Sequence, residues 1–424
     1  MGTDLHTPLP CPIIKCPSSL PHLPKEAGEA ATLTHWWPQD RSDMIEIIYW
    51  TSLLLLLHTW FLFGAVLWVI CCLKQRSEPP STSSFDPSVS FIVAARDEER
   101  FIRSRIENLL SLRYDKERVE VVVASDGSGD KTVAIARELQ ASRGRVRVLE
   151  YPVPRGRAAV HNDTASSASG EILVFTDAET RFDELFLQRV IPHFLDPKVG
   201  AVSGRILYTN EGQSSVTLSA GLYWQMEERL RVWEGRLGIL AFGTGAAFCM
   251  RRDLYVTMQK PYDDVDYSET LSLVARGYKV CYEPRALAYD TVPPSAKIAH
   301  RVRLRRTSMA FRSILDGVIT FRLWRRPGVL LSVISHKLLR HLTPFFMISF
   351  AGSNLLLLEA GPWYQVTLIM QIAFYLMAIL GGIGHCKGWR LKTLGIPFNF
   401  VILNYSRMLG ALEGLLKRPP STYR

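Results

Sequence analysis

The sequence lacks the patterns that would place it in several common classes of protein. Its seven cysteines show neither a zinc-ligand spacing nor a disulfide framework, which indicates a reduced and therefore cytosolic main domain. No G-x-G-x-x-G motif opens the first helix of the soluble part, which argues against a Rossmann-type oxidoreductase. No signal peptide is recognisable, because no apolar core follows a basic start. Internal repeats are absent, and apolar segments are too few for a transporter.

Hydrophobic residues make up 47% of the chain and gather near its two ends. Residues 1–43 are rich in Pro, Thr and His without periodicity, so we expect a disordered N-terminal extension, with Met44 as an alternative start. An apolar run with basic residues directly after it predicts a transmembrane helix over 44–76 whose C-terminal end faces the cytoplasm. A linker containing Ser and Pro, over 77–87, leads into a soluble middle.

The C-terminal third mixes apolar and basic segments. Positive residues crowd 301–326, and an amphipathic pattern follows, so we expect helices over 298–341 that lie at the membrane surface. The net charge of +10 is therefore assigned to lipid headgroups, and not to nucleic acid. Segments within 342–383 can cross the bilayer. Residues 384–424 are expected to form a cytoplasmic loop, a re-entrant or interfacial helix and a basic tail, because basic residues flank an apolar stretch on both sides.

Between these ends, residues 88–297 alternate between apolar strands and amphipathic helices. Strands are expected over 88–95, 119–125, 146–151 and 172–176, with helices over 99–112, 132–142 and 157–168. Continuous apolar strands separated by helices are typical of a mostly parallel sheet that is covered on both faces. We therefore predict an α/β domain whose ligands bind at the carboxyl ends of the strands.

Acidic residues follow two of these strands. Asp126 precedes a glycine-rich turn, where its carboxylate can accept from a uracil N–H or from ribose hydroxyls. Asp177 and Glu179 follow the fourth strand, and such a pair supplies the hard oxygen ligands that Mg²⁺ and Mn²⁺ prefer. Taken singly, the first motif also fits a tight surface turn and the second a capped loop.

Three further motifs lie at predicted loops and helix starts. Arg157 begins a helix, where its cation and the N-terminal amides suit a phosphate. The run Gly243, Thr244 and Gly245 allows a sugar to approach the backbone closely. Asp264 and Asp266 lie in an acidic cluster, and Asp266 is our candidate for a base that removes a proton from an acceptor hydroxyl. The alternatives are a solvated basic turn, a packing turn and an acidic helix cap.

In this order, the motifs resemble those of the family 2 glycosyltransferases that include cellulose, hyaluronan and poly-N-acetylglucosamine synthases. The resemblance covers about 88–345 and extends to an opening acidic segment, Arg96, Asp97 and Glu98. Glu179 replaces the family's usual second Asp, and Val265 replaces the Glu of its Thr-Glu-Asp triplet. In the Gln-x-x-Arg-Trp motif, His300 and Leu304 replace Gln and Trp, while Arg303 is retained. Because that aromatic residue normally packs at the acceptor end, repeated and single transfer both stay open.

The resemblance implies a GT-A type fold with flanking transmembrane helices and an inverting single displacement. It assigns the donor nucleotide and diphosphate to Arg96, Asp97, Glu98, Asp126, Arg157, Asp177, His300 and Arg303. It assigns sugar or acceptor contacts to Gly243, Thr244, Gly245 and Asp264, a Mg²⁺ or Mn²⁺ ion to Asp177 and Glu179, and the catalytic base to Asp266.

We expect a nucleotide-sugar donor, a UDP-sugar, and a glycan or lipid-linked acceptor. The expected setting is the bacterial inner membrane, with the catalytic domain in the cytoplasm, membrane lipids around the helices, and export or assembly proteins as candidate partners. The alternatives are a single-transfer enzyme acting on a polyprenyl phosphate or another lipid-linked acceptor, and a non-catalytic membrane scaffold that binds sugar nucleotides.

Overall fold

The computed structural model describes residues 39–74, 85–209, 215–291, 296–387 and 392–416. Most of the predicted N-terminal extension, most of the predicted linker and the basic tail lie outside these residues.

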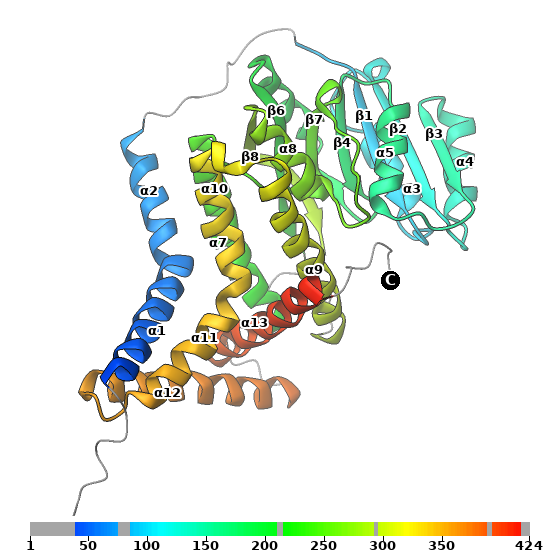
Figure 1. Cartoon of the computed structure of the whole chain (residues 1–424). Coiled ribbons are helices and arrows are strands. Elements are labelled where there is room, and N and C mark those ends of the chain that lie inside the picture. Colours follow the sequence, from blue (N-terminus) through cyan, green and yellow to red (C-terminus); the bar gives the residue numbers. More distant parts are fainter. Residues whose placement is uncertain (1–38, 75–84, 210–214, 292–295, 388–391, 417–424) are drawn as a thin grey trace, which may run out of the picture.

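The described strands form one eight-stranded sheet in the order β3-β2-β1-β4-β7-β6-β8-β5 (Figure 1). The pairs β1–β2, β2–β3, β1–β4 and β6–β8 are parallel, whereas β7 runs antiparallel to β4 and β6, and β5 to β8. The mostly parallel α/β sheet predicted from the strand pattern is thereby confirmed. The strands are Val89–Ala95 (β1), Val119–Asp126 (β2), Val146–Tyr151 (β3), Ile172–Asp177 (β4), Arg181–Phe182 (β5), Val199–Tyr208 (β6), Phe248–Arg251 (β7) and Lys279–Asp290 (β8).

Both faces of the sheet are covered by helices, because its central strands are apolar on both sides. All seven residues of β1 are buried: Phe91 and Val93 pack on one face and Ile92 on the other. Each such side chain stabilises the fold by roughly 1.5–3 kcal/mol. The first face is covered by α3 (Ile102–Leu110), α4 (Thr132–Arg143) and α6 (Phe186–Val190), and the second by α5 (Arg157–Ser167), α8 (Thr270–Ala275) and part of α9 (Ala296–Thr320).

Long helices on one side of the sheet carry the apolar surface (Figure 1). Among the described residues, two helical stretches are long and apolar enough to cross a membrane, Arg41–Leu73 and Pro362–His385. The first consists of α1 (Gln39–Leu57), a π-helical turn (His58–Leu62) and α2 (Phe63–Leu73), and the second belongs to α12 (Pro362–Cys386). The segment predicted to cross ahead of α12 forms α11 (Leu339–Leu356), which is not one of the two stretches.

Segment 327–341, expected to be an amphipathic helix lying at the membrane surface, buries three of its basic residues inside the protein. Here α10 (Pro327–Ser332), a π-helical turn (Val333–Leu338) and α11 follow one another directly. His336, Lys337 and Arg340 are buried, and all three bind Glu227 of α7 (Ser215–Leu237). The physical reason is that buried charges need partners, and α7 supplies them from more than 100 residues away in the chain.

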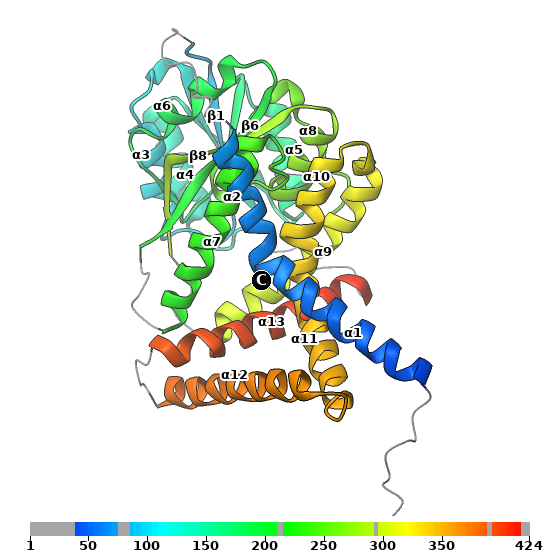
Figure 2. The same cartoon turned by 90° about the vertical axis from the view of Figure 1, so that its left-hand side faces the viewer.

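Helix α13 (Lys392–Leu416) packs directly on the backbone of α9. A Cβ atom placed on Gly410 would lie 2.7 Å from Cβ of Thr307 and 2.9 Å from the Leu304 carbonyl oxygen. A Cβ atom on Gly414 would lie 2.8 Å from the Ser308 carbonyl oxygen. Figure 2 shows α13 between the α/β domain and α12. The face of α9 that carries Leu304 is therefore occupied by α13.

Candidate active site

The polar side chains predicted to act together follow neighbouring strands of the sheet. Asp97 comes after β1, Asp126 ends β2 and Asp177 ends β4. Ala94 of β1 pairs with both Ala124 of β2 and Asp177 of β4, so the three strands end at the same side of the sheet. Because these strands are parallel and adjacent, the three carboxylates lie along the same edge.

Asp126 organises the loop that precedes α5. Its fully buried carboxylate accepts from the main-chain N–H of Arg155 at 2.6 Å and from that of Gly156 at 3.0 Å. Gly156 has a φ of 90°, a conformation that favours glycine. Asp126 thereby fixes the start of α5, where Arg157 stands, and its contact with a nucleotide stays a prediction.

The opening acidic segment is tied to the turn after β2. Oδ1 of Asp97 accepts from the Gly129 N–H at 2.8 Å, and the Glu98 N–H donates to Oγ1 of Thr132 at 2.8 Å. Nε of Arg96 lies 3.9 Å from the Asp97 carboxylate. Burial, with the carboxylates of Glu179, Asp177, Asp130 and Asp97 nearby, raises the pKa of Glu98 to about 7. The negative charge that these carboxylates concentrate around Glu98 favours either a bound cation or a protonated carboxyl group at this position.

Arg157 links two of the predicted carboxylate sites. Its guanidinium donates to Oδ1 of Asp177 and lies 3.6 Å from Oδ2 of Asp264. The side chain is only partly exposed, which strengthens these charge interactions relative to a surface pair. The arginine therefore joins the end of β4 to the segment that contains Asp266.

Asp266 lies in a π-helical turn, Val265–Glu269, against the glycine-rich loop. Its main-chain carbonyl accepts from the Gly243 N–H at 2.9 Å, and a Cβ atom on Gly245 would come within 2.1 Å of its Oδ1. That oxygen is buried and has no hydrogen-bond partner among the described residues. Burial, together with the neighbouring Asp264 carboxylate, raises the pKa of Asp266 to about 7. A carboxylate with an oxygen that accepts no hydrogen bond from the described residues and with a pKa near neutrality has the properties of a general base.

Asp177 and Glu179 fit a metal ion only in part. Desolvation and the carboxylates of Asp290 and Asp177 raise the pKa of Glu179, although the residue as a whole is exposed. No group of three His, Cys, Asp or Glu side chains in the described ranges is placed to hold a metal. Mg²⁺ is usually held by one or two carboxylates together with substrate phosphates. The donor set therefore suits an ion whose coordination a bound diphosphate completes.

One of the residues predicted to bind the donor, on α9, is engaged by a neighbouring helix. His300, predicted to bind the donor, lies against α13: its Nδ1 is 2.7 Å from Oγ of Ser406, and its ring stacks on Tyr405. His300 thus serves the packing of α9 on α13. Arg303 is half-buried on the same helix, and its predicted role in donor binding stays a prediction.

Arg306 is the arginine of α9 that sequence reasoning missed. The residue as a whole is exposed. Desolvation would lower the pKa of its guanidinium, but Tyr208, Asp177 and Asp266 outweigh that effect and raise the pKa. The same arginine counteracts the raised pKa of Glu179 and of Asp290. The sequence feature that could have pointed to Arg306 is the basic run of this helix, in which Arg306 stands almost one helical turn after Arg303.

The comparison with protein families decides what kind of domain this is. The model described as Glycosyl transferase family 2 matches residues 90–257. The chain carries a family 2 glycosyltransferase domain. The family expected from the order of the motifs is thereby confirmed.

Relatives of the glycosyltransferase domain include enzymes with different acceptors. The chain is 29% identical over 159 residues to the beta-monoglucosyldiacylglycerol synthase of Synechocystis sp., which covers 36% of this chain and 33% of that protein. It is 25% identical over 209 residues to the poly-beta-1,6-N-acetyl-D-glucosamine synthase of Staphylococcus aureus, which covers 48% of this chain and 50% of that protein. The chain thus spans half or less of the length of these two relatives.

A solved structure confirms the fold of the glycosyltransferase domain. The mannosyltransferase of Pyrobaculum calidifontis, in complex with GDP-Man and Mn²⁺, superposes with a TM-score of 0.65 at 19% identity. The match covers 88% of this chain and 98% of the mannosyltransferase. The expected GT-A fold is therefore observed.

Proposed function

We propose that this protein is an inverting glycosyltransferase that moves a sugar from a nucleotide-sugar donor to a hydroxyl group of a membrane-associated acceptor. The observation that carries the proposal is the placement of Asp266. Its half-buried side chain keeps one buried carboxylate oxygen without a hydrogen-bond partner among the described residues. The Arg157 guanidinium, which binds Asp177 and lies 3.6 Å from Asp264, lowers the pKa of Asp266. This arrangement supports Asp266 as the base and Arg157 as the cation for a phosphate, at the edge of the sheet where such folds bind ligands.

The donor would lie along that edge. Arg157 at the N-terminus of α5 and Arg306 on α9 supply positive charge for a diphosphate. Asp177 and Glu179 would hold Mg²⁺ or Mn²⁺, which when bound offsets the negative charge of the leaving group. The mannosyltransferase complex with GDP-Man and Mn²⁺ supports a nucleotide sugar and a divalent metal. The segment from Arg96 to Glu98 and Asp126 would hold the nucleotide, which we predict to be uridine.

The proposed reaction is a single displacement. Asp266 takes the proton of the acceptor hydroxyl as the acceptor oxygen bonds to the anomeric carbon. The bond from that carbon to the diphosphate oxygen breaks, and the nucleoside diphosphate leaves with the electron pair. Attack opposite the leaving group inverts the anomeric configuration. General base catalysis of this kind contributes roughly 10²–10⁴-fold to the rate.

A single transfer to a lipid-linked acceptor is the candidate that the helix packing favours over repeated elongation. In this chain Leu304 takes the place of the family's tryptophan, and its carbonyl lies against Gly410 of α13. The close packing of α9 on α13 at this residue argues against a bulky aromatic contact with a growing glycan there. The two candidate membrane-spanning stretches would keep the enzyme close to such a lipid. The two relatives named above include one lipid glycosyltransferase and one polysaccharide synthase, so the family permits either outcome.

A donor screen tests the proposal. The full chain, purified in lipid nanodiscs, is supplied with UDP- and GDP-sugars and a membrane lipid extract, in Mn²⁺ with and without EDTA. We expect metal-dependent release of nucleoside diphosphate and a lipid product enlarged by one sugar. Long glycans would refute the single transfer. Nucleotide-sugar binding without any release would favour the non-catalytic scaffold instead.

A further inference from the structure

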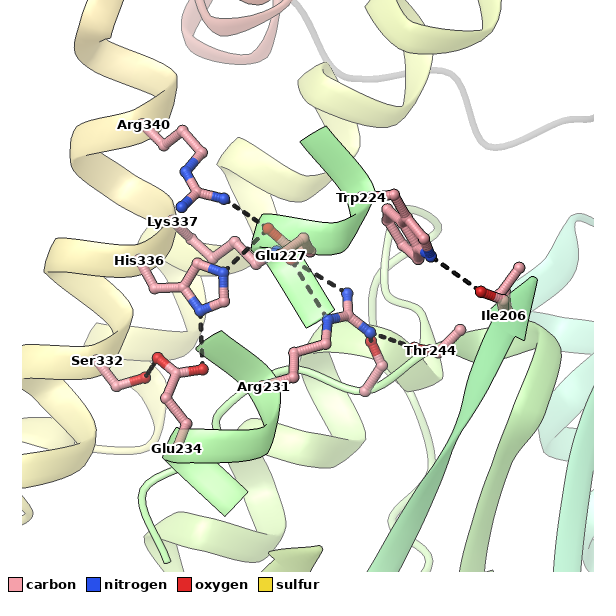
Figure 3. A network of polar contacts seen from close by, with 11 residues as sticks. Ile206, Trp224, Glu227, Arg231, Glu234, Thr244, Ser332, His336, Lys337 and Arg340 are labelled. Atoms are coloured by element: carbon pink, nitrogen blue, oxygen red, sulfur yellow. Dashed lines mark hydrogen bonds and ion pairs between the residues drawn. The ribbon is translucent and has the colours of Figure 1, made fainter. Parts of the chain in front are cut away.

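A buried cluster of charges lies between α7 and the helix over 327–356 (Figure 3). Glu227 of α7 is 1% exposed, and its carboxylate accepts from Lys337, from Nη1 of Arg340 at 2.5 Å and from Nε2 of His336 at 3.0 Å. Glu234, two turns further along α7, is fully buried and binds Nδ1 of His336 at 2.8 Å. His336 therefore has a carboxyl group within hydrogen-bond distance of each of its ring nitrogens.

Such a cluster is poorly explained by stability alone. Removing several charges from water is unfavourable, and pairing them in the interior only offsets that loss. An apolar contact between α7 and α10–α11 would hold the two helices together equally well. What a set of mutually bonded charges adds is a fixed geometry for its members. The member that extends beyond the cluster is Arg231.

Arg231 connects the cluster to the glycine-rich loop. It is 6% exposed, and its guanidinium lies 3.3 Å from Oε1 of Glu227. Its Nη1 donates to the Gly243 carbonyl oxygen at 3.2 Å and to Oγ1 of Thr244 (Figure 3). Its guanidinium also lies 5.3 Å from the ring of Trp224, which is anchored by a hydrogen bond from Nε1 to the Ile206 carbonyl of β6. The arginine is thus held from two sides while it holds the loop.

The loop in turn borders Asp266. The Gly243 N–H donates to the Asp266 carbonyl oxygen at 2.9 Å. Gly245 approaches the Asp266 carboxylate so closely that no Cβ atom fits between them. A shift of the loop would therefore displace Asp266 directly, with no intervening side chain to absorb it.

We infer that Arg231 is a positioning residue for sugar transfer: anchored by the Glu227 cluster, it fixes the Gly243-to-Gly245 loop and, through it, the carboxylate of Asp266. The predicted effect of Arg231 on catalysis rests on the proposed function, whereas its predicted effect on the position of the loop does not. The helix over 327–356 carries His336, Lys337 and Arg340. Through Glu227 and Arg231, a chain of hydrogen bonds and ion pairs connects this helix to the proposed active site.

The test compares variants of neighbouring residues on α7. Arg231→Met removes the donor groups, and Glu227→Gln weakens their anchor. Glu228→Gln is the matched control, because Glu228 stands next in sequence but pairs with Arg205 at 2.7 Å. We measure amide hydrogen exchange at Gly243 and, for the donor found by the screen, kcat and KM. Arg231→Met should speed exchange at Gly243 at least tenfold and lower kcat about 10–100-fold, since small misplacements of reacting groups have effects of this size. KM for the donor should stay within about twofold.

Arg231→Lys distinguishes positioning from a general structural role. Lysine keeps the positive charge but lacks the fork that reaches the loop and Glu227 together. Burial and the carboxylates of Asp264 and Asp177 raise the pKa of Asp266, whereas the cations of Arg157 and Arg231 lower it. The charge of Arg306 also interacts with Asp266. Arg231→Met should therefore move the acidic limb of the kcat profile to higher pH. Arg231→Lys should lower kcat with that limb unmoved.

Each outcome decides something. Unchanged exchange at Gly243 in both Arg231 variants would overturn the inference, whatever the activity. Faster exchange with unchanged kcat would also overturn it, because the loop would then not position Asp266. Should Arg231→Met fail to fold, the Arg231→Lys and Glu227→Gln proteins answer the same two questions. If the unmodified chain transfers no sugar from any donor, the proposed function fails, while the exchange data still decide whether Arg231 fixes the loop.

Discussion

Replacing Asp266 with Asn removes the proposed base with little change in shape. The amide cannot take a proton from the acceptor hydroxyl, although it keeps an oxygen beside Gly245. General base catalysis is worth roughly 10²–10⁴-fold, which corresponds to about 2.7–5.5 kcal/mol of transition-state stabilisation. We therefore expect kcat of Asp266→Asn to fall by at least about 100-fold, with KM for the donor nearly unchanged.

The pH dependence of the unmodified enzyme tests the same residue from another direction. Burial and Asp264 raise the pKa of Asp266 to about 7. Below that pH the carboxyl is protonated and cannot act as a base, so activity is lost as pH falls and gained as it rises. With a pKa of about 7, the ionised fraction changes about tenfold between pH 6 and pH 8, and kcat should change in proportion.

The assay is release of nucleoside diphosphate at saturating donor and acceptor, from pH 5.5 to 9. Asp263→Asn is the control, since Asp263 lies in the same acidic segment but bonds to the Lys260 N–H and the Ser268 hydroxyl. It should retain the activity and the pH profile of the unmodified protein. Asp266→Asn with near-normal kcat, or a profile flat between pH 6 and pH 8, would refute the assignment of the base.

Three other changes have definite expected outcomes. Gly245→Ala should lower kcat at least tenfold in a folded protein, because its Cβ atom would lie 2.1 Å from Oδ1 of Asp266; Gly352→Ala, with nothing within 4 Å, is its control in the same release assay. Asp177→Asn should raise the Mn²⁺ concentration needed for half-maximal release, and EDTA should abolish release by the unmodified protein; equal Mn²⁺ dependence would remove Asp177 from the metal site. Asp126→Asn should destabilise the fold by about 1–3 kcal/mol, because one buried main-chain N–H would then face an amide NH₂ group. An unchanged midpoint in a denaturant titration would contradict the role of Asp126 in fixing the start of α5.

Much of the sheet and its acidic edge was predictable because the determining signals are local. The apolar runs of β1, β2 and β4 each end at a polar residue followed by a turn, so Asp126 and Asp177 were found at strand ends before any tertiary contact was known. The membership of Asp264 and Asp266 in one acidic segment was equally local. Arg157 was placed correctly at a helix start, but its bridge between Asp177 and Asp264 depends on the tertiary fold.

What the sequence could not predict depends on helix packing. Every third or fourth residue of α9 shares a face, and only contact with Gly410 and Gly414 of α13 decides which face that is. His300 was therefore assigned to the donor, and Arg306 was overlooked. In the same way, an amphipathic helix with Lys and Arg looks alike whether its charges meet lipid headgroups or, as at Glu227, buried carboxylates.

The configuration of the product tests the central claim most directly, namely that one base at the carboxyl edge of the sheet drives a single displacement. The anomeric proton coupling of the transferred sugar is measured by NMR for a donor of known α configuration, with Mn²⁺ and the full chain. We predict a β-linked product from the unmodified protein, and none detectable in the same time from Asp266→Asn. An α-linked product, or equal yield from both proteins, would contradict the account.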